Sequence, residues 1–237
     1  MGAGGRSIAR IGEPISFYLY EREEFVNPDD GIIMIVDQDG SGGAPNDGDL
    51  ILAGSPFPDF YGGLANNMSF KNFDLSMFFQ FSYGNEIYNA TRSWMENLKL
   101  NDRTIIGTNT TQAAFDNRWQ QPGDITRYPG VNYDGRNDNY TLPHTGWLED
   151  GSYLRLKSLT FGYTFDSTLL SKLNLNSARI YLTANNLLTF TNYSGFDPEV
   201  DHFTGVNGGA NSGLLRGYDY GSYPQARSLR IGINVTF

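Results

Sequence analysis

The residues of this chain that could do chemistry include a group of carboxylates in one glycine-rich stretch. Asp37, Asp39, Asp47 and Asp49 surround Gly40 there. Clustered carboxylates repel one another unless water or a hard cation screens them, and calcium takes oxygen ligands of this kind. The spacing departs from the EF-hand pattern, because no Glu stands at the closing position. The pattern therefore favours a solvated acidic loop, with calcium as the alternative cofactor.

The other titratable residues do not form a catalytic pattern. His144 and His202 have no carboxylate or histidine at ligand spacing, so we expect surface residues rather than a metal site. Glu149 and Asp150 are adjacent and would point apart in an extended chain, which does not suit an acid/base pair. No Gly-x-Ser-x-Gly elbow is present. We assign no catalytic residues and expect no enzyme.

All three tryptophans of the chain and several tyrosines lie in the longest predicted loop, residues 89–151. Their flat faces suit stacking on sugar rings or contact with a protein partner. The alternative is that they pack the loop onto itself, because a loop of this length needs a small core of its own. The candidates for ligand or partner contact are Trp94, Trp119, Tyr128, Tyr133, Tyr140 and Trp147.

Composition narrows the class of protein that positions these residues. The 237 residues are 14% aromatic and include 28 Gly and 15 Tyr, which favours strands and turns. No apolar run approaches the ~18 residues of a transmembrane helix. The absence of Cys excludes disulfides and thiolate chemistry. A net charge of -9 with scattered basic residues argues against binding to nucleic acid.

Alternation of apolar and polar residues predicts six long strands, at 7–20, 59–70, 73–88, 153–165, 178–190 and 225–237. Short helices are predicted at 91–100, 111–119 and 168–172. In the fourth strand Leu154 and Leu156 are out of phase with Leu159 and Phe161, which indicates a bulge or a strand that rises out of the apolar layer. The two clearest apolar faces consist of Phe73, Leu75, Met77, Phe79 and Phe81, and of Leu229, Ile231, Ile233, Val235 and Phe237.

The connections between these strands alternate between long and short, which places all long loops on one side of the sheet. This asymmetry is typical of outer-membrane barrels. The strands also exceed the ~5–6 residues of globular sheets and match the ~9–11 of a membrane strand. We therefore predict an all-β fold, an antiparallel up-and-down transmembrane β-barrel segment whose two apolar faces contact lipid. Six strands cannot close a barrel, since closed barrels begin at about eight.

Several blocks of sequence, taken together and in order, resemble one family. They are residues 54–63 (GSPFPDFYGG), 70–76 (FKNFDLS), 83–89 (YGNEIYN), 153–163 (YLRLKSLTFGY), 185–199 (NNLLTFTNYSGFDPE) and the closing strand. They are similar to the late barrel of SusC-like (SusC/RagA) TonB-linked outer-membrane transporters of Bacteroidetes. The resemblance implies a barrel of about 22 strands around a plug. Residues 1–237 would be the C-terminal portion of that barrel domain, with the plug, the earlier strands and the export signal lying upstream.

The resemblance also implies a function and partners. The chain would be a fragment of a TonB-dependent importer in the bacterial outer membrane that takes up glycan or oligopeptide. Its partners would be a SusD-like surface lipoprotein, outer-membrane lipid, the ligand, and TonB through the missing N-terminal part. The alternative is a secreted soluble β-rich carbohydrate-binding module. The two hypotheses predict opposite environments, lipid or a buried core, for residues such as Phe73 and Phe81.

Overall fold

A computed structural model of the chain describes residues 6–96, 98, 109–131, 138–200 and 216–237. The chain divides into two units. We call the first the loop unit; it comprises Met1–Phe57, Asn85–Asp150 and Ser194–Ser222. The second, the strand unit, comprises Pro58–Gly84, Gly151–Tyr193 and Tyr223–Phe237. In the described part of the chain, no helix is long and apolar enough to cross a membrane.

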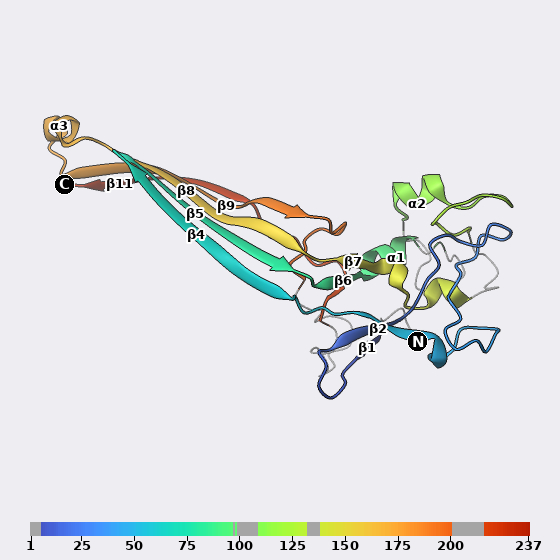
Figure 1. Cartoon of the computed structure of the whole chain (residues 1–237). Coiled ribbons are helices and arrows are strands. Elements are labelled where there is room, and N and C mark those ends of the chain that lie inside the picture. The colour runs from blue at the N-terminus through green and yellow to red at the C-terminus, as the bar shows by residue number, and fades with distance from the viewer. Residues whose placement is uncertain (1–5, 97, 99–108, 132–137, 201–215) are drawn as a thin grey trace, which may run out of the picture. The chain divides into compact units, whose positions relative to one another are not determined.

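The strand unit is an antiparallel sheet of five long strands in the order β11-β9-β8-β5-β4 (Figure 1). Its strands are β4 (Phe60–Phe70), β5 (Phe73–Tyr83), β8 (Tyr153–Thr164), β9 (Ser177–Thr191) and β11 (Ser228–Thr236). Five of the six predicted strands are therefore present in this sheet, the one predicted at 73–88 only as far as Tyr83, and the antiparallel β-rich class is confirmed. β4 and β11 lie at the two edges of this sheet.

The register places apolar side chains of all five strands on one face. Met77 of β5, for example, pairs with Leu159 of β8, which pairs with Ala184 of β9, which pairs with Leu229 of β11. Residues directly opposite one another in a sheet share a face. Exposed members of this face include Phe60, Leu64, Met68, Phe70, Phe73, Phe161, Ile180, Leu188, Phe190, Leu229, Ile231, Ile233 and Val235.

A bulge explains the change of phase within β8. Adjacent residues Phe78 and Phe79 of β5 pair with Ser158 and Leu156, so that Lys157 is the extra residue against β5. A bulge inserts one unpaired residue into a strand and thereby restores the alternation on its far side. Leu154 and Leu156 consequently lie on the same face as Leu159, and the predicted bulge is confirmed.

The opposite face of the sheet carries polar pairs between strands. Arg179 on β9 donates from Nε to Oδ1 of Asp74 at 3.0 Å and from Nη2 to Oδ2 at 2.5 Å. This pair passes over Gly162 on β8, where a Cβ would lie 2.4 Å from Nη2 of Arg179. Thr160 on β8 and Thr183 on β9 form a hydrogen bond between their hydroxyls at 3.1 Å. Glycine at 162 leaves the space that the ion pair needs.

Both short connections leave the same end of the sheet. Lys71, with φ of 53°, and Asn72 join β4 to β5. The helical turns α3 (Ser167–Leu170) and η4 (Ser171–Leu173) join β8 to β9. The backbone N–H of Thr164 donates to the Asn72 carbonyl at 2.8 Å, which ties the two connections together. The predicted alternation of long and short connections is thus confirmed.

The loop unit consists of two small sheets and short helices. One sheet has the order β1-β2-β3 and the other the order β10-β6-β7. The strands are β1 (Arg6–Ile8), β2 (Ser16–Tyr20), β3 (Leu50–Gly54), β6 (Glu86–Asn89), β7 (Leu148–Asp150) and β10 (Tyr218–Asp219). The helices are α1 (Ala90–Glu96) and α2 (Gln112–Asn117), with 3-10 turns η1 (Asp47–Asp49), η2 (Asp138–Thr141) and η3 (Thr145–Trp147).

Two of the predicted strands, 7–20 and 73–88, are wrong in extent, because each is interrupted at a glycine. Residues 7–20 form a hairpin rather than one strand, because Gly12 adopts a φ of 84° and Ser7 pairs back onto Phe17. Residues 73–88 divide at Gly84, whose φ is 86°, so that β6 belongs to a different sheet from β5. Glycine adopts a positive φ at little cost, and such a residue can turn the chain out of a regular strand. Apolar alternation continues across both breaks, which is why it did not reveal them.

The loop unit has its own apolar core. One cluster contains Phe17, Leu19, Tyr88, Trp147 and Tyr218, with Ala90. Tyr218 lies at its centre, with its ring centroid 5.2 Å from those of Phe17 and Tyr88. A second cluster consists of Val26, Ile33 and Tyr140, with Trp119 packed against it.

Candidate functional site

The aromatic residues predicted to contact a ligand lie in different environments within the loop unit. Trp94 is 45% exposed, and its ring meets Tyr220 edge-on at 5.9 Å. Tyr128 is partly buried and lines a cavity described below. Trp119 is also partly buried, and its indole N–H donates to the Pro28 carbonyl at 3.0 Å. Contact of these three with a ligand or partner stays a prediction.

The other aromatic candidates belong to the interior. Tyr140 is buried, and its hydroxyl lies 2.9 Å from the carbonyl of Gly130. Trp147 is buried between His144, stacked at 5.2 Å, and the Arg92 guanidinium at 5.5 Å. Tyr140 and Trp147 thus lie where the alternative hypothesis, packing of the loop onto itself, would place them. Tyr133 lies outside the described residues.

His144 is fully buried, and the expectation that it lies at the surface is wrong. Its Nδ1 accepts the N–H of Gly146 at 3.1 Å and so caps η3. Burial, and then the charge of Arg22, hold the pKa of His144 well below its usual value. The neutral ring carries its proton on Nε2, which is buried without a hydrogen-bond partner in the described structure. His202 lies outside the described residues.

A cavity of about 560 Å³ in the loop unit brings together charged residues that are far apart in sequence. Its walls carry three arginines and three glutamates beside Tyr128 and Trp147. Its charged lining residues are Arg22, Glu23, Glu24, Arg92, Arg127 and Glu149. Sequence reasoning missed this group, since no spacing rule connects positions 22, 92, 127 and 149.

Arg92 is fully engaged at one wall of this cavity. Its Nη1 donates to Glu149 at 2.7 Å, and its Nη2 donates to Glu96 at 2.9 Å. Glu149 also accepts the backbone N–H of Ser194 at 2.8 Å and the amide of Asn89 at 3.1 Å. Burial raises the pKa of Glu149, but the hydrogen bonds from Ser194 and Arg92 outweigh it and lower the pKa. Glu149 therefore stays ionised at neutral pH.

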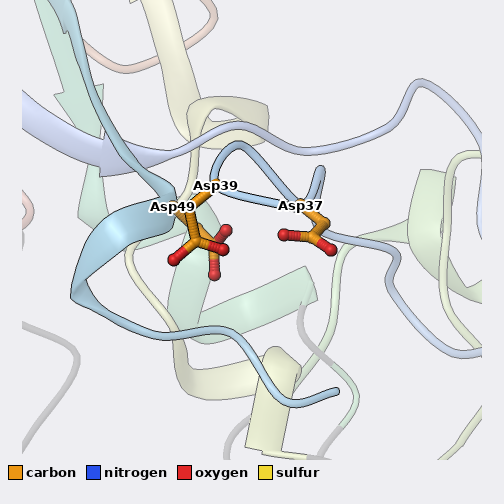
Figure 2. Close-up of side chains that lie close together, drawn as sticks. All are labelled: Asp37, Asp39 and Asp49. Carbon is orange, nitrogen blue, oxygen red and sulfur yellow. The ribbon is translucent and has the colours of Figure 1, made fainter. Parts of the chain in front are cut away.

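Three of the four predicted acidic-loop residues lie together (Figure 2). Carboxylate oxygens of Asp37, Asp39 and Asp49 lie within 4.8 Å of one another, and Asp47 is not part of this group. Backbone N–H groups already bind them: Ser41 donates to Asp39 at 2.9 Å and Gly42 donates to Asp37 at 3.0 Å. The hydrogen bonds from Ser41 lower the pKa of Asp39. Calcium binding at this group stays a prediction.

Comparison with known proteins relates the chain to transport proteins. No family model matches it. It is 36% identical to TonB-dependent receptor P3 of Formosa agariphila over 97% of this chain and 23% of that protein. It is 37% identical to TonB-dependent receptor P26 of the same organism over 85% of this chain. TonB-dependent receptor SusC of Bacteroides thetaiotaomicron is 26% identical over 94% of this chain and 19% of that protein.

Solved structures give the same relationship. The RagAB peptide transporter matches 98% of this chain and 23% of that chain, with a TM-score of 0.76 and 26% identity. The RagAB peptide importer in its open-open state matches with a TM-score of 0.75 and 26% identity. Against the closed-closed state the TM-score is 0.64 at 25% identity.

The resemblance to SusC-like TonB-dependent receptors is therefore confirmed, and the sheet is part of a larger barrel fold. The chain spans about a quarter or less of the relatives it matches and of the solved chains. The comparisons give no support to the alternative of a soluble carbohydrate-binding module. The assignment of residues 1–237 to one C-terminal barrel portion stays a prediction.

Proposed function

We propose that this chain supplies part of the barrel wall, and loops that contact ligand and partner, to a TonB-dependent nutrient importer of the bacterial outer membrane. The observation that carries the proposal is the continuous apolar face of the strand unit, on which Leu64 is 61% and Ile231 73% exposed. Soluble proteins rarely leave an apolar surface of this extent uncovered. In an outer-membrane barrel, a face of this kind contacts the hydrocarbon of the bilayer.

The two faces of the sheet would then have different surroundings. The lipid-facing residues would be Phe73, Leu75, Met77, Phe79 and Phe81 on β5, and Leu229, Ile231, Ile233, Val235 and Phe237 at the closing strand. The face with the Asp74–Arg179 pair would line the lumen. The edges of β4 and β11 would pair with further strands, because an open edge in lipid leaves its backbone groups unsatisfied.

The mechanism would be gated passage of a ligand rather than bond chemistry, and no catalytic residue is assigned. The ligand would be an oligopeptide or a glycan; the RagAB proteins that resemble this chain are a peptide importer. The partners would be a SusD-like surface lipoprotein at the loops and TonB at a part of the receptor outside this chain. No nucleic acid is expected, given the net charge of -9.

Spin labels on adjacent residues of β5 test the proposal. Labels at Leu75 and Phe79 would sit on the apolar face, and a label at Ser76 on the opposite face. In reconstituted vesicles we expect the first two to be quenched by a lipid-soluble reagent and Ser76 by a water-soluble one. Protection of Leu75 and Phe79 from both reagents, as in a buried core, would show that the barrel assignment is wrong.

A further inference from the structure

Arg22 differs from the other two arginines of the cavity in its pairing. Arg92 is paired with Glu96 and Glu149, and Arg127 is paired with Glu24. For Arg22, no carboxylate lies at ion-pair distance among the residues that the structure describes. Its Nη2 donates to the Arg127 carbonyl, while its Nε is buried without a hydrogen-bond partner.

The surroundings of Arg22 make this lack of a partner costly. Burial is the main cause that lowers the pKa of Arg22 to about 10; the charges of Arg127 and Arg92 also lower it, and that of Glu96 raises it by less. Buried charges in proteins are normally paired, because transfer from water to a less polar interior is unfavourable. A desolvated guanidinium at the wall of a cavity is therefore a place where an added anion gains free energy.

The local structure holds Arg22 in position. Its backbone N–H donates to the hydroxyl of Thr145 at 3.0 Å, and the residue pairs with Ile35 as an isolated bridge. Gly146 packs against the side chain so closely that a Cβ there would lie 2.9 Å from Cδ and Nη1. Thr145 and Gly146 also line the cavity. The Arg22 side chain is thus held by its neighbours at the wall of the cavity.

We propose that this cavity binds one carboxylate group of a ligand through the guanidinium of Arg22. The planar fork of arginine matches the two oxygens of a carboxylate. The glutamates in the walls would repel a doubly charged phosphate more strongly than a singly charged carboxylate. A volume of about 560 Å³ falls in the range of small-ligand sites, ~300–1,000 Å³.

Two kinds of ligand carry this group. One is the C-terminal or side-chain carboxylate of a peptide, and the other is the carboxylate of a uronic acid. Tyr128 and Leu148 supply apolar wall for either. The proposal deepens the proposed role of the loops in ligand contact and rests on it for its biological meaning.

The test compares matched probes on the outer-membrane protein that carries this chain, purified in detergent. Calorimetry would measure binding of an N-acetylated dipeptide with a free carboxylate against its C-terminal amide, and of glucuronate against glucose. We expect at least one acid to bind about tenfold more tightly than its neutral counterpart. The arm in which this preference appears identifies the source of the carboxylate.

Variants assign the preference to Arg22. Arg22→Gln should abolish it, and Arg22→Lys, which keeps the charge but lacks the fork, should retain part of it. Arg10→Gln changes an exposed arginine elsewhere in the loop unit and should bind like the unmodified protein. Amide hydrogen exchange of the loop unit would verify that each variant is folded; if Arg22→Gln is not, Arg22→Lys and Arg10→Gln decide the matter.

The proposal is overturned if neither acid is preferred over its neutral counterpart, or if Arg22→Gln keeps the preference. Its failure is separable from that of the proposed function. If the acid is not preferred but the spin labels lie in lipid, the assignment of the sheet to the barrel wall stands. If the spin labels are not in lipid but the acid is still preferred, the carboxylate site stands and its role in import does not.

Discussion

The two units of this chain place their apolar side chains in opposite ways. In the loop unit, Phe17, Leu19 and Tyr218 are each 0% exposed and pack on one another. In the strand unit, Leu64 and Ile231 are more than half exposed although they are as apolar as the core residues. Apart from α3 and η4, the described strand unit is a single sheet, and one layer cannot bury its own face. The loop unit buries its apolar side chains within itself, whereas the apolar face of the strand unit needs lipid or further protein to cover it.

The largest expected effect comes from breaking the core of the loop unit. Phe17→Ala removes a buried ring that meets Tyr218 at 5.2 Å, and we expect it to cost about 3–5 kcal/mol. Hydrogen exchange should then rise in β2, β6 and β10 and stay unchanged in β5 and β8. Phe73→Ala, at a ring that is 45% exposed, is the matched control and should leave the loop unit protected. Equal loss of protection in both units would show that they do not differ in this way.

A charge on either face of β4 tests the strand unit. Leu64→Arg places a guanidinium on the proposed lipid face and should cost about 2–4 kcal/mol near the middle of the bilayer. Asn67→Arg, three positions further along the same strand, points to the other face and should cost much less. The measurement is the free energy of unfolding from lipid vesicles. Equal costs for the two variants would contradict a one-sided lipid contact.

Acid should loosen the loop unit selectively through Glu149. Because the folded pKa of Glu149 is lowered, its contribution to stability is complete above the unfolded value of 4.5 and is lost as pH falls through the folded value. Glu149→Gln should destabilise the unit by about 1–3 kcal/mol at pH 7. The difference should shrink towards zero as the pH falls, as followed by hydrogen exchange between pH 7 and pH 3. A difference independent of pH would exclude the carboxylate as the cause.

The smallest effect is expected for the polar face of the sheet. A double-mutant cycle of Asp74→Ala and Arg179→Ala should give a coupling of about 0.2–1 kcal/mol, because both side chains are about one-third exposed. The free energy of unfolding in detergent supplies the four values of the cycle. A coupling well above this range would mean that water is excluded from this face as well.

The sequence by itself determined much of the strand unit. Alternation with a period of two identifies β4, β5, β8, β9 and β11 and their apolar face, because each side chain's direction in a strand follows from its position alone. The short turn at Lys71 and Asn72 and the bulge at Lys157 were also readable, since both leave a mark within a few residues. These features are local.

Only the tertiary structure decided the organisation of the loop unit. It turned residues 7–20 back at Gly12, buried His144 and Trp147, and brought Arg22, Arg92 and Arg127 to one cavity. Burial and charge pairing depend on which distant segments meet, and no local period records such meetings. Alternation therefore predicted the face of the sheet, whereas the unpaired charge of Arg22 could be seen only after the chain had folded.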